Sequence, residues 1–104
     1  MKLFIDTSDN TKTVVGLDDD RLEKPTGADK SQQVLGLINQ ILGKKTLKDI
    51  TEIKVETGAG LPAGRQGSFT GLRVGVAVAN GLAWTLKVPV NGQKMVKPKY
   101  EEGK

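Results

Sequence analysis

Apolar residues recur at two different periods along the chain, and the change of period separates predicted strands from predicted helices. Residues 2–7, 11–17 and 21–24 are short apolar or Thr/Val-rich segments divided by polar turns, which predicts three strands. Residues 51–57 alternate apolar with charged side chains, as a half-exposed strand does. A last short strand is predicted over residues 87–92.

Helical spacing predicts two helices. Within residues 31–43 the apolar side chains fall three and four positions apart, and Gly43 ends the pattern. A second helix is predicted to begin near Ser68 or Thr70 and to run to Leu86. Along it, small residues recur every four positions, at Gly71, Gly75, Ala79 and Ala83. Such a stripe lets another backbone approach closely.

The order of these elements predicts the fold class. Strands joined by short turns pair antiparallel, whereas strands reached through a helix pair parallel. We therefore expect an α/β fold, a single ribonuclease-H/actin-like lobe with a mixed five-stranded sheet and two main helices. Residues 1–92 are expected to form this lobe, and residues 93–104, rich in Lys and Glu, a polar tail.

Composition excludes several kinds of chemistry. The chain has 104 residues with no Cys and no His, so disulfide frameworks, thiolate metal sites and a His general base are ruled out. The longest apolar stretch, residues 74–86, is too short for a membrane span, and the apolar run at the N-terminus is too short for a signal peptide. We expect a soluble, cytoplasmic protein without membrane contact.

Charge is distributed unevenly. Residues 1–56 carry nine Lys/Arg against ten Asp/Glu, whereas residues 57–104 carry seven against two. No acidic residue occurs from Thr57 to Tyr100. The basic half is either a solvated face or a surface that contacts a phosphate backbone or an acidic partner, and net charge alone does not decide between them.

Two segments carry candidate chemistry. Residues 58–63 fit the dinucleotide pattern G-x-G-x-x-G/A, but Pro62 and Gly64 oppose a helix start there and the expected downstream acid is missing. Asp6 ends the first strand, where ribonuclease-H-like nucleases bind catalytic metal, and Glu56 could add a second carboxylate. Because helix 31–43 has no acid, we favour Asp6 as the cap of the following turn and expect no bound metal or cofactor.

Residues 67–75, with the sequence GSFTGLRVG, form the most specific segment of the chain. Its turn positions are Gly67, Ser68, Thr70, Gly71 and Gly75. Continued by residues 77–83 and 88–90, it resembles the TsaB family, the non-catalytic partner in bacterial tRNA threonylcarbamoyladenosine synthesis. Residues 5–8 resemble that family's opening strand, and residues 46–55 resemble the segment before its Gly loop. The resemblance extends from residue 3 to about residue 92.

The resemblance implies an actin-like lobe whose two helices form a bundle with the catalytic subunit TsaD or with a second copy. TsaD carries metal-binding histidines, which this chain lacks, so the chain resembles the partner and not the enzyme. The implied contacts with tRNA are indirect. The outward apolar positions of the helices and one cation would form the partner interface: Leu37, Ile41, Arg73, Val74 and Val78.

Three features depart from the family pattern. Residues 61–67 are an apparent insertion before Ser68, and the second lobe that closes a nucleotide cleft in actin-like proteins is absent. The third feature is that Pro98 and Tyr100 resemble the family's C-terminal Pro-x-Tyr, which would imply an internal deletion. Two alternative hypotheses follow from the sequence. One is a metal-dependent ribonuclease-H-like nuclease using Asp6 and Glu56, and the other is a truncated remnant without function.

Overall fold

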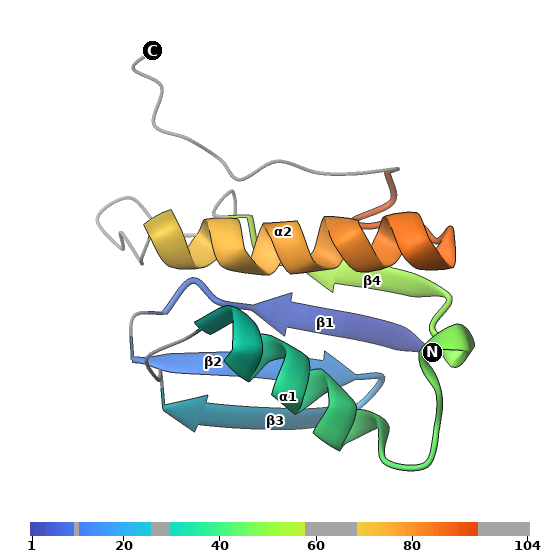
Figure 1. Cartoon of the computed structure of the whole chain (residues 1–104), viewed down its shortest axis with the longest axis horizontal. Helices are drawn as coiled ribbons and strands as arrows, with labels where there is room; N and C mark the ends of the chain where they lie inside the picture. The colour runs from blue at the N-terminus through green and yellow to red at the C-terminus, as the bar shows by residue number, and fades with distance from the viewer. Residues whose placement is uncertain (10, 26–29, 58–68, 94–104) are drawn as a thin grey trace.

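A computed structural model describes residues 1–9, 11–25, 30–57 and 69–93 (Figure 1). Its elements follow in this order: β1 (Lys2–Asp6), β2 (Lys12–Leu17), β3 (Asp20–Pro25), α1 (Lys30–Leu42), the 3-10 turn η1 (Leu47–Asp49), β4 (Glu52–Val55) and α2 (Phe69–Leu86). The predicted loop at 58–67 and the predicted tail fall almost wholly outside the described residues. The domain boundary at residue 92 therefore stays a prediction.

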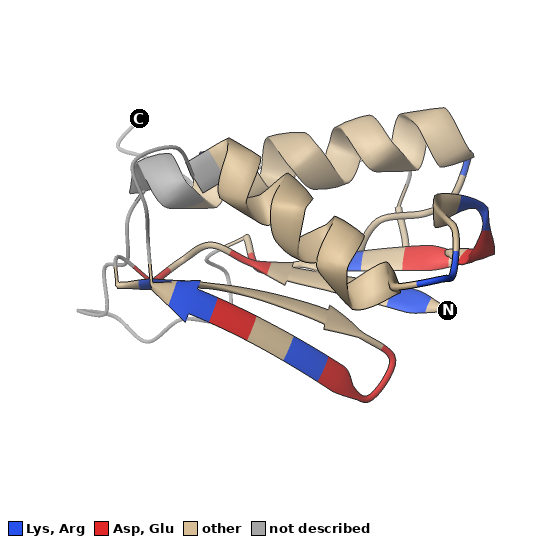
Figure 2. Ribbon diagram, turned by 60° about the horizontal axis from the view of Figure 1, so that its bottom comes forward, with Lys and Arg blue, Asp and Glu red and all other residues tan. Residues whose placement is uncertain are grey.

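The described strands form a mixed sheet in the order β3-β2-β1-β4. The pairs β1/β2 and β2/β3 are antiparallel, and β1/β4 is parallel. Both directions were predicted from the connections, because short turns link the first three strands and α1 separates β3 from β4. Both helices lie on one face of this sheet, so the lobe has two layers (Figures 1 and 2).

The central strand β1 separates the two faces of the sheet by strict alternation. Leu3 and Ile5 are fully buried, and their neighbours in β2 and β4 are buried with them. Together with the helices they form the core, whose sheet residues are Leu3, Ile5, Val15, Leu17, Ile53 and Val55. The helices cover this apolar face, and burying it supplies the main driving force for folding.

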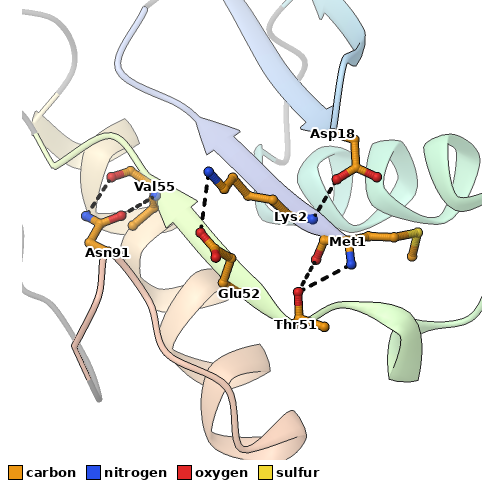
Figure 3. Close-up of polar contacts among 7 residues, drawn as sticks. All are labelled: Met1, Lys2, Asp18, Thr51, Glu52, Val55 and Asn91. Carbon is orange, nitrogen blue, oxygen red and sulfur yellow. Dashed lines mark hydrogen bonds and ion pairs between the residues drawn. The ribbon is translucent and has the colours of Figure 1, made fainter.

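The opposite face of the sheet is charged. Lys2 forms an ion pair with Glu52 at 3.5 Å across the parallel pair (Figure 3). Lys12 pairs with Glu23 at 3.2 Å, and the Arg21 guanidinium lies 4.7 Å from the centroid of the Phe4 ring. These partly exposed pairs each contribute little to stability, but they mark a surface suited to water.

The fifth strand predicted over residues 87–92 does not form, and the described sheet has four strands. Only Val90 makes isolated bridges, one of them parallel to Ile53 as the prediction required. Pro89 has no N–H to donate, and Asn91 and Gly92 have φ angles of 51° and 79°. This left-handed backbone turns the chain away before a ladder can extend.

The Asn91 side chain takes the place of the missing strand (Figure 3). The amide oxygen accepts from the Val55 N–H at 2.9 Å, and the amide nitrogen donates to the Val55 carbonyl at 3.0 Å. The backbone N–H of Asn91 donates to the Ile53 carbonyl at 2.8 Å. The Asn91 residue therefore satisfies the outer edge of β4, which would otherwise be open to another strand.

A left-handed cap ends α2. Lys87 has a φ angle of 60°, and the Val88 N–H donates to the Ala83 carbonyl at 3.1 Å. This is the Schellman arrangement, in which the second residue past the cap closes the last turn. Lys87 thus lies at the exposed end of α2 while the chain reverses toward β4.

The end of β1 sets how closely α2 approaches the sheet. The buried Thr7 hydroxyl accepts a hydrogen bond of 3.1 Å from the Gly75 N–H within α2. A β-carbon at Gly75 would collide with the Thr7 side chain and lie 3.4 Å from Ile5. Gly75 is therefore required by packing, as the predicted small-residue stripe implied.

Replacing Gly75 tests this close approach. Gly75→Ala is expected to destabilise the fold by about 1–3 kcal/mol, because the added methyl overpacks the contact with Thr7. Gly81→Ala is the matched control, since nothing lies within 4 Å of its β-carbon position. It should stabilise the helix by roughly 0.5–1 kcal/mol. Urea denaturation followed by circular dichroism measures both, and equal effects at the two sites would contradict the packing argument.

Asn91→Gly tests the side-chain clamp without disturbing the backbone, because glycine accepts a positive φ. Loss of both bonds to Val55 is expected to lower the free energy of unfolding by about 1–3 kcal/mol. Gln93→Ala removes an exposed side chain from the same segment and should leave stability unchanged. A denaturation midpoint for Asn91→Gly equal to that of the parent protein would show that the clamp is not needed.

Candidate functional site

The inner sides of both helices face the sheet and are apolar. In α2 the buried positions include Leu72, Val76, Ala79 and Ala83, and in α1 they are Val34, Leu37, Ile38 and Leu42. Each set recurs three or four residues apart, the spacing of one helix side. The two helices also contact each other, so they form one continuous layer over the sheet. We call this the helix layer.

The outer side of the helix layer carries almost no charge (Figure 2). Neither helix contains an acid, and the only cations in them are Lys30 and Arg73. The exposed positions of known burial are Gln32, Leu35, Gly36, Asn39 and Gln40 in α1, and Arg73, Ala77, Gly81, Trp84 and Thr85 in α2. Helices that face water usually carry charged or polar residues on their outer side, and here the polar ones are mostly uncharged amides such as Gln32, Asn39 and Gln40. The outer side of the helix layer is therefore polar but almost without charge.

Apolar side chains reach the outer side at several points. Leu35 is 46% exposed and Trp84 is 82% exposed. Val74 and Val78 lie four residues apart and are half-buried, packed partly against the core. Large exposed apolar side chains with small neighbours favour contact with another protein. Although α2 is rich in apolar residues, no helix in the described ranges combines the length and hydrophobicity that crossing a bilayer requires.

The predicted interface residues differ in how far the structure exposes them. Arg73 is exposed, and Ile41 is half-buried against the core, as are Val74 and Val78. Leu37 is 2% exposed and belongs to the core, so its prediction as an outward position is wrong. Its side of α1 faces the sheet, which apolar spacing alone cannot distinguish from an outward stripe.

The predicted turn residues fall at the start of α2. Thr70 and Gly71 lie in its first turn, and Gly75 is buried against Thr7. Gly67 and Ser68 lie outside the described residues, as do the dinucleotide-like pattern at 58–63 and the apparent insertion at 61–67.

Sequence reasoning did not select the two most exposed apolar residues of the layer, Leu35 and Trp84. Each of them directly follows a buried residue of its helix, Val34 before Leu35 and Ala83 before Trp84. A helical projection centred on the most apolar side would have placed Trp84 outside it, whereas Leu35 projects beside the buried Leu42 at the edge of that side. Trp84 is also the only tryptophan of the chain.

Asp6 takes part in a turn, as favoured. Its Oδ1 accepts from the Ser8 N–H at 2.9 Å and from the Ser8 hydroxyl at 2.6 Å. Glu56 follows β4, and its N–H donates to the Ile5 carbonyl at 3.0 Å, so the two acids end adjacent parallel strands. Within the described residues no three potential metal-ligating side chains come together. The observed contacts of Asp6 are those of an Asx-type turn.

Comparison with known proteins identifies the class of the fold. YeaZ from Pseudomonas aeruginosa superimposes with a TM-score of 0.63 at 26% identity, over 86% of this chain and 40% of that one. A second structure, of an uncharacterized protein with similarity to peptidase YEAZ from the same organism, gives a TM-score of 0.66 with the same identity and coverage. The fold is thus a YeaZ-like lobe of the ribonuclease-H/actin type.

Residues 25–93, more than half of the chain, match the family model "TsaD: tRNA N6-adenosine threonylcarbamoyltransferase". The chain belongs to this family, and its likeness to YeaZ makes it a TsaB-like protein related to tRNA modification. No match was found among curated proteins. The chain spans about 40% of the length of the solved structures that it matches.

The role of Asp6 can be tested by two substitutions. Asp6→Asn keeps the oxygen that accepts from Ser8 and should change the free energy of unfolding by less than about 0.5 kcal/mol, whereas Asp6→Ala should lower it by about 1–2 kcal/mol. Titration calorimetry with Mn²⁺ is expected to show no binding to the parent chain. Stoichiometric Mn²⁺ binding that Asp6→Asn abolishes would instead support the nuclease hypothesis.

Proposed function

We propose that this chain is a non-catalytic subunit of tRNA threonylcarbamoyladenosine modification that docks a TsaD-like catalytic partner through its helix layer. The observation that carries the proposal is the almost uncharged outer side of α1 and α2, with Leu35 exposed on it. Family membership supports a role in tRNA modification, because the chain matches the TsaD family model and the YeaZ structure.

The docking mechanism is packing. Gly36, Ala77 and Gly81 are exposed positions with little or no side chain, where a partner helix could come close to the backbone. Leu35, Val74 and Val78 would supply the apolar contacts around them. A partner that buried this surface would gain free energy in proportion to the apolar area covered, about 25 cal/mol per Å² before the losses of association.

The proposal leaves catalysis to the partner. Asp6 is engaged in a turn with Ser8, which supports a structural role for the acid that the nuclease hypothesis needs. The sequence has no His, and the resemblance implies that TsaD uses histidines to hold metal. We assign the protein to the cytoplasm, as expected for a subunit that supports tRNA modification.

The helix layer could also pair with a second copy of this chain. An isologous dimer places the same patch on both subunits, so it would compete with the TsaD-like partner for one surface. Light scattering of the isolated chain, repeated with the partner present, separates the two. A homodimer that persists in the presence of excess partner would oppose the proposed docking.

Carboxylates introduced on the outer side should abolish docking. Leu35→Glu and Ala77→Glu alter exposed positions, so the core is untouched, whereas Val78→Glu also reaches the core edge. Each is expected to weaken binding to the TsaD-like protein from the same source by at least about tenfold, because an unpaired charge would be buried. Co-purification and titration calorimetry measure the effect.

Lys54→Glu is the control for this experiment. Lys54 is exposed on β4 beside Phe4, on the charged face of the sheet, and changing it should leave binding intact. Circular dichroism confirms that every variant is folded. Unchanged binding by Leu35→Glu and Ala77→Glu in their native fold would exclude the helix layer as the docking surface.

A further inference from the structure

The C-terminal end of α2 exposes an aromatic ring next to a cation. Trp84 is 82% exposed, the largest exposed fraction among the large apolar side chains of the described residues. Lys87 follows three residues later at the helix end and is exposed. Because the left-handed cap at Lys87 directly follows the last turn of α2, this cation lies at the same helix end as Trp84. The exposed indole and the exposed ammonium group therefore both occur at the C-terminal end of α2.

Further cations lie at the same end of the molecule. Lys48 belongs to η1, and Lys44 and Lys45 follow the end of α1; all three are exposed. Figures 1 and 2 both place η1 and the C-terminal end of α2 at the same end of the molecule. Neither Lys48 nor Lys87 forms an ion pair with an acid in the described part of the chain, whereas Lys2 and Lys12 do.

The nearby acids are already engaged. The Asp49 carboxylate accepts from the Thr46 N–H at 3.1 Å, and Glu52 pairs with Lys2 at 3.5 Å. The helix α2 itself contains no acid. An exposed aromatic ring, unpaired cations and an acid-free helix together are the features of a surface that binds single-stranded nucleic acid.

We propose that this end of the molecule binds a single-stranded segment of RNA. A base stacks on the Trp84 indole, and the phosphates on either side contact Lys87 and Lys48. The proposal rests on the proposed function, which brings the chain to a tRNA, but it makes the contact direct instead of mediated by the partner. Stacking is tolerant of sequence, so the surface positions RNA without reading its bases.

RNA and the catalytic partner can bind together. Helix geometry places Trp84 about a quarter to a third of a turn around the axis from Val74 and Val78, and at least one turn further along it. Partner contacts centred on Leu35, Val74 and Val78 therefore leave the end of α2 accessible. The partner would hold the catalytic site while this surface orients the RNA strand.

The single tryptophan gives a direct readout. Titration of the full chain with oligouridylate of about 12 nucleotides is expected to quench Trp84 fluorescence saturably, with an affinity that falls as salt rises. Absence of quenching at low salt would overturn the proposal. Quenching by the TsaD-like protein and not by RNA would also overturn it, because Trp84 would then be a protein contact.

Substitutions separate the two kinds of contact. Lys48→Gln with Lys87→Gln should lower the affinity about tenfold and flatten its salt dependence, whereas Lys54→Gln, an exposed cation on the other sheet face, should change neither. Trp84→Ala should lower the affinity for RNA about tenfold, and Trp84→Phe should lower it much less, as measured by the anisotropy of labelled RNA. Equal affinity of Lys54→Gln and the double variant would contradict the site.

Co-purification with the TsaD-like protein is measured on the same variants. Loss of RNA binding in variants that still dock the partner is the expected result. If the parent chain binds the partner but not RNA, the RNA surface is refuted and the proposed docking stands. If it binds RNA but no partner, the docking is refuted and the RNA surface stands.

Discussion

The close approach of α2 to the end of β1 governs how the two layers of this lobe fit together. The Gly75 N–H donates to the Thr7 hydroxyl, and the lack of a side chain at Gly75 lets the helix reach that distance. Once α2 is held there, its inner residues close over β1 and β4 beside α1, and its other sides are left outward. The position of the proposed docking surface thus follows from one contact between a helix backbone and a strand end.

The two faces of the molecule have opposite chemistry. On the sheet face, Lys2 pairs with Glu52 and Lys12 pairs with Glu23, so the charges within each pair balance. This face is therefore stable in contact with water. Among the described side chains, none in the helix layer forms an ion pair, and Leu35 and Trp84 are exposed there. This contrast supports assigning partner contact to the helices and explains why charge reversal at Lys54 serves as a control.

Part of the candidate site could be read from the sequence and part could not. The stripe containing Gly75 predicted a close approach, and Arg73 is exposed where an interface was expected. Leu37 was misassigned, because apolar spacing identifies a helix side without saying whether the sheet or the solvent faces it. Trp84 lies outside the apolar side of its helix, which a helical projection of the sequence could have indicated.

The sequence by itself determined the order of elements, the antiparallel and parallel pairings, and the role of Asp6 in a turn, because these depend on local spacing and connection length. Only the tertiary structure decided the number of strands and the outward side of each helix. Residues 87–92 have the apolar character of a strand, yet the left-handed backbone at Asn91 ends it and the Asn91 amide replaces its hydrogen bonds to Val55. The number of strands and the outward side of each helix depend on contacts between residues far apart in the sequence, and the local pattern of apolar residues does not contain these contacts.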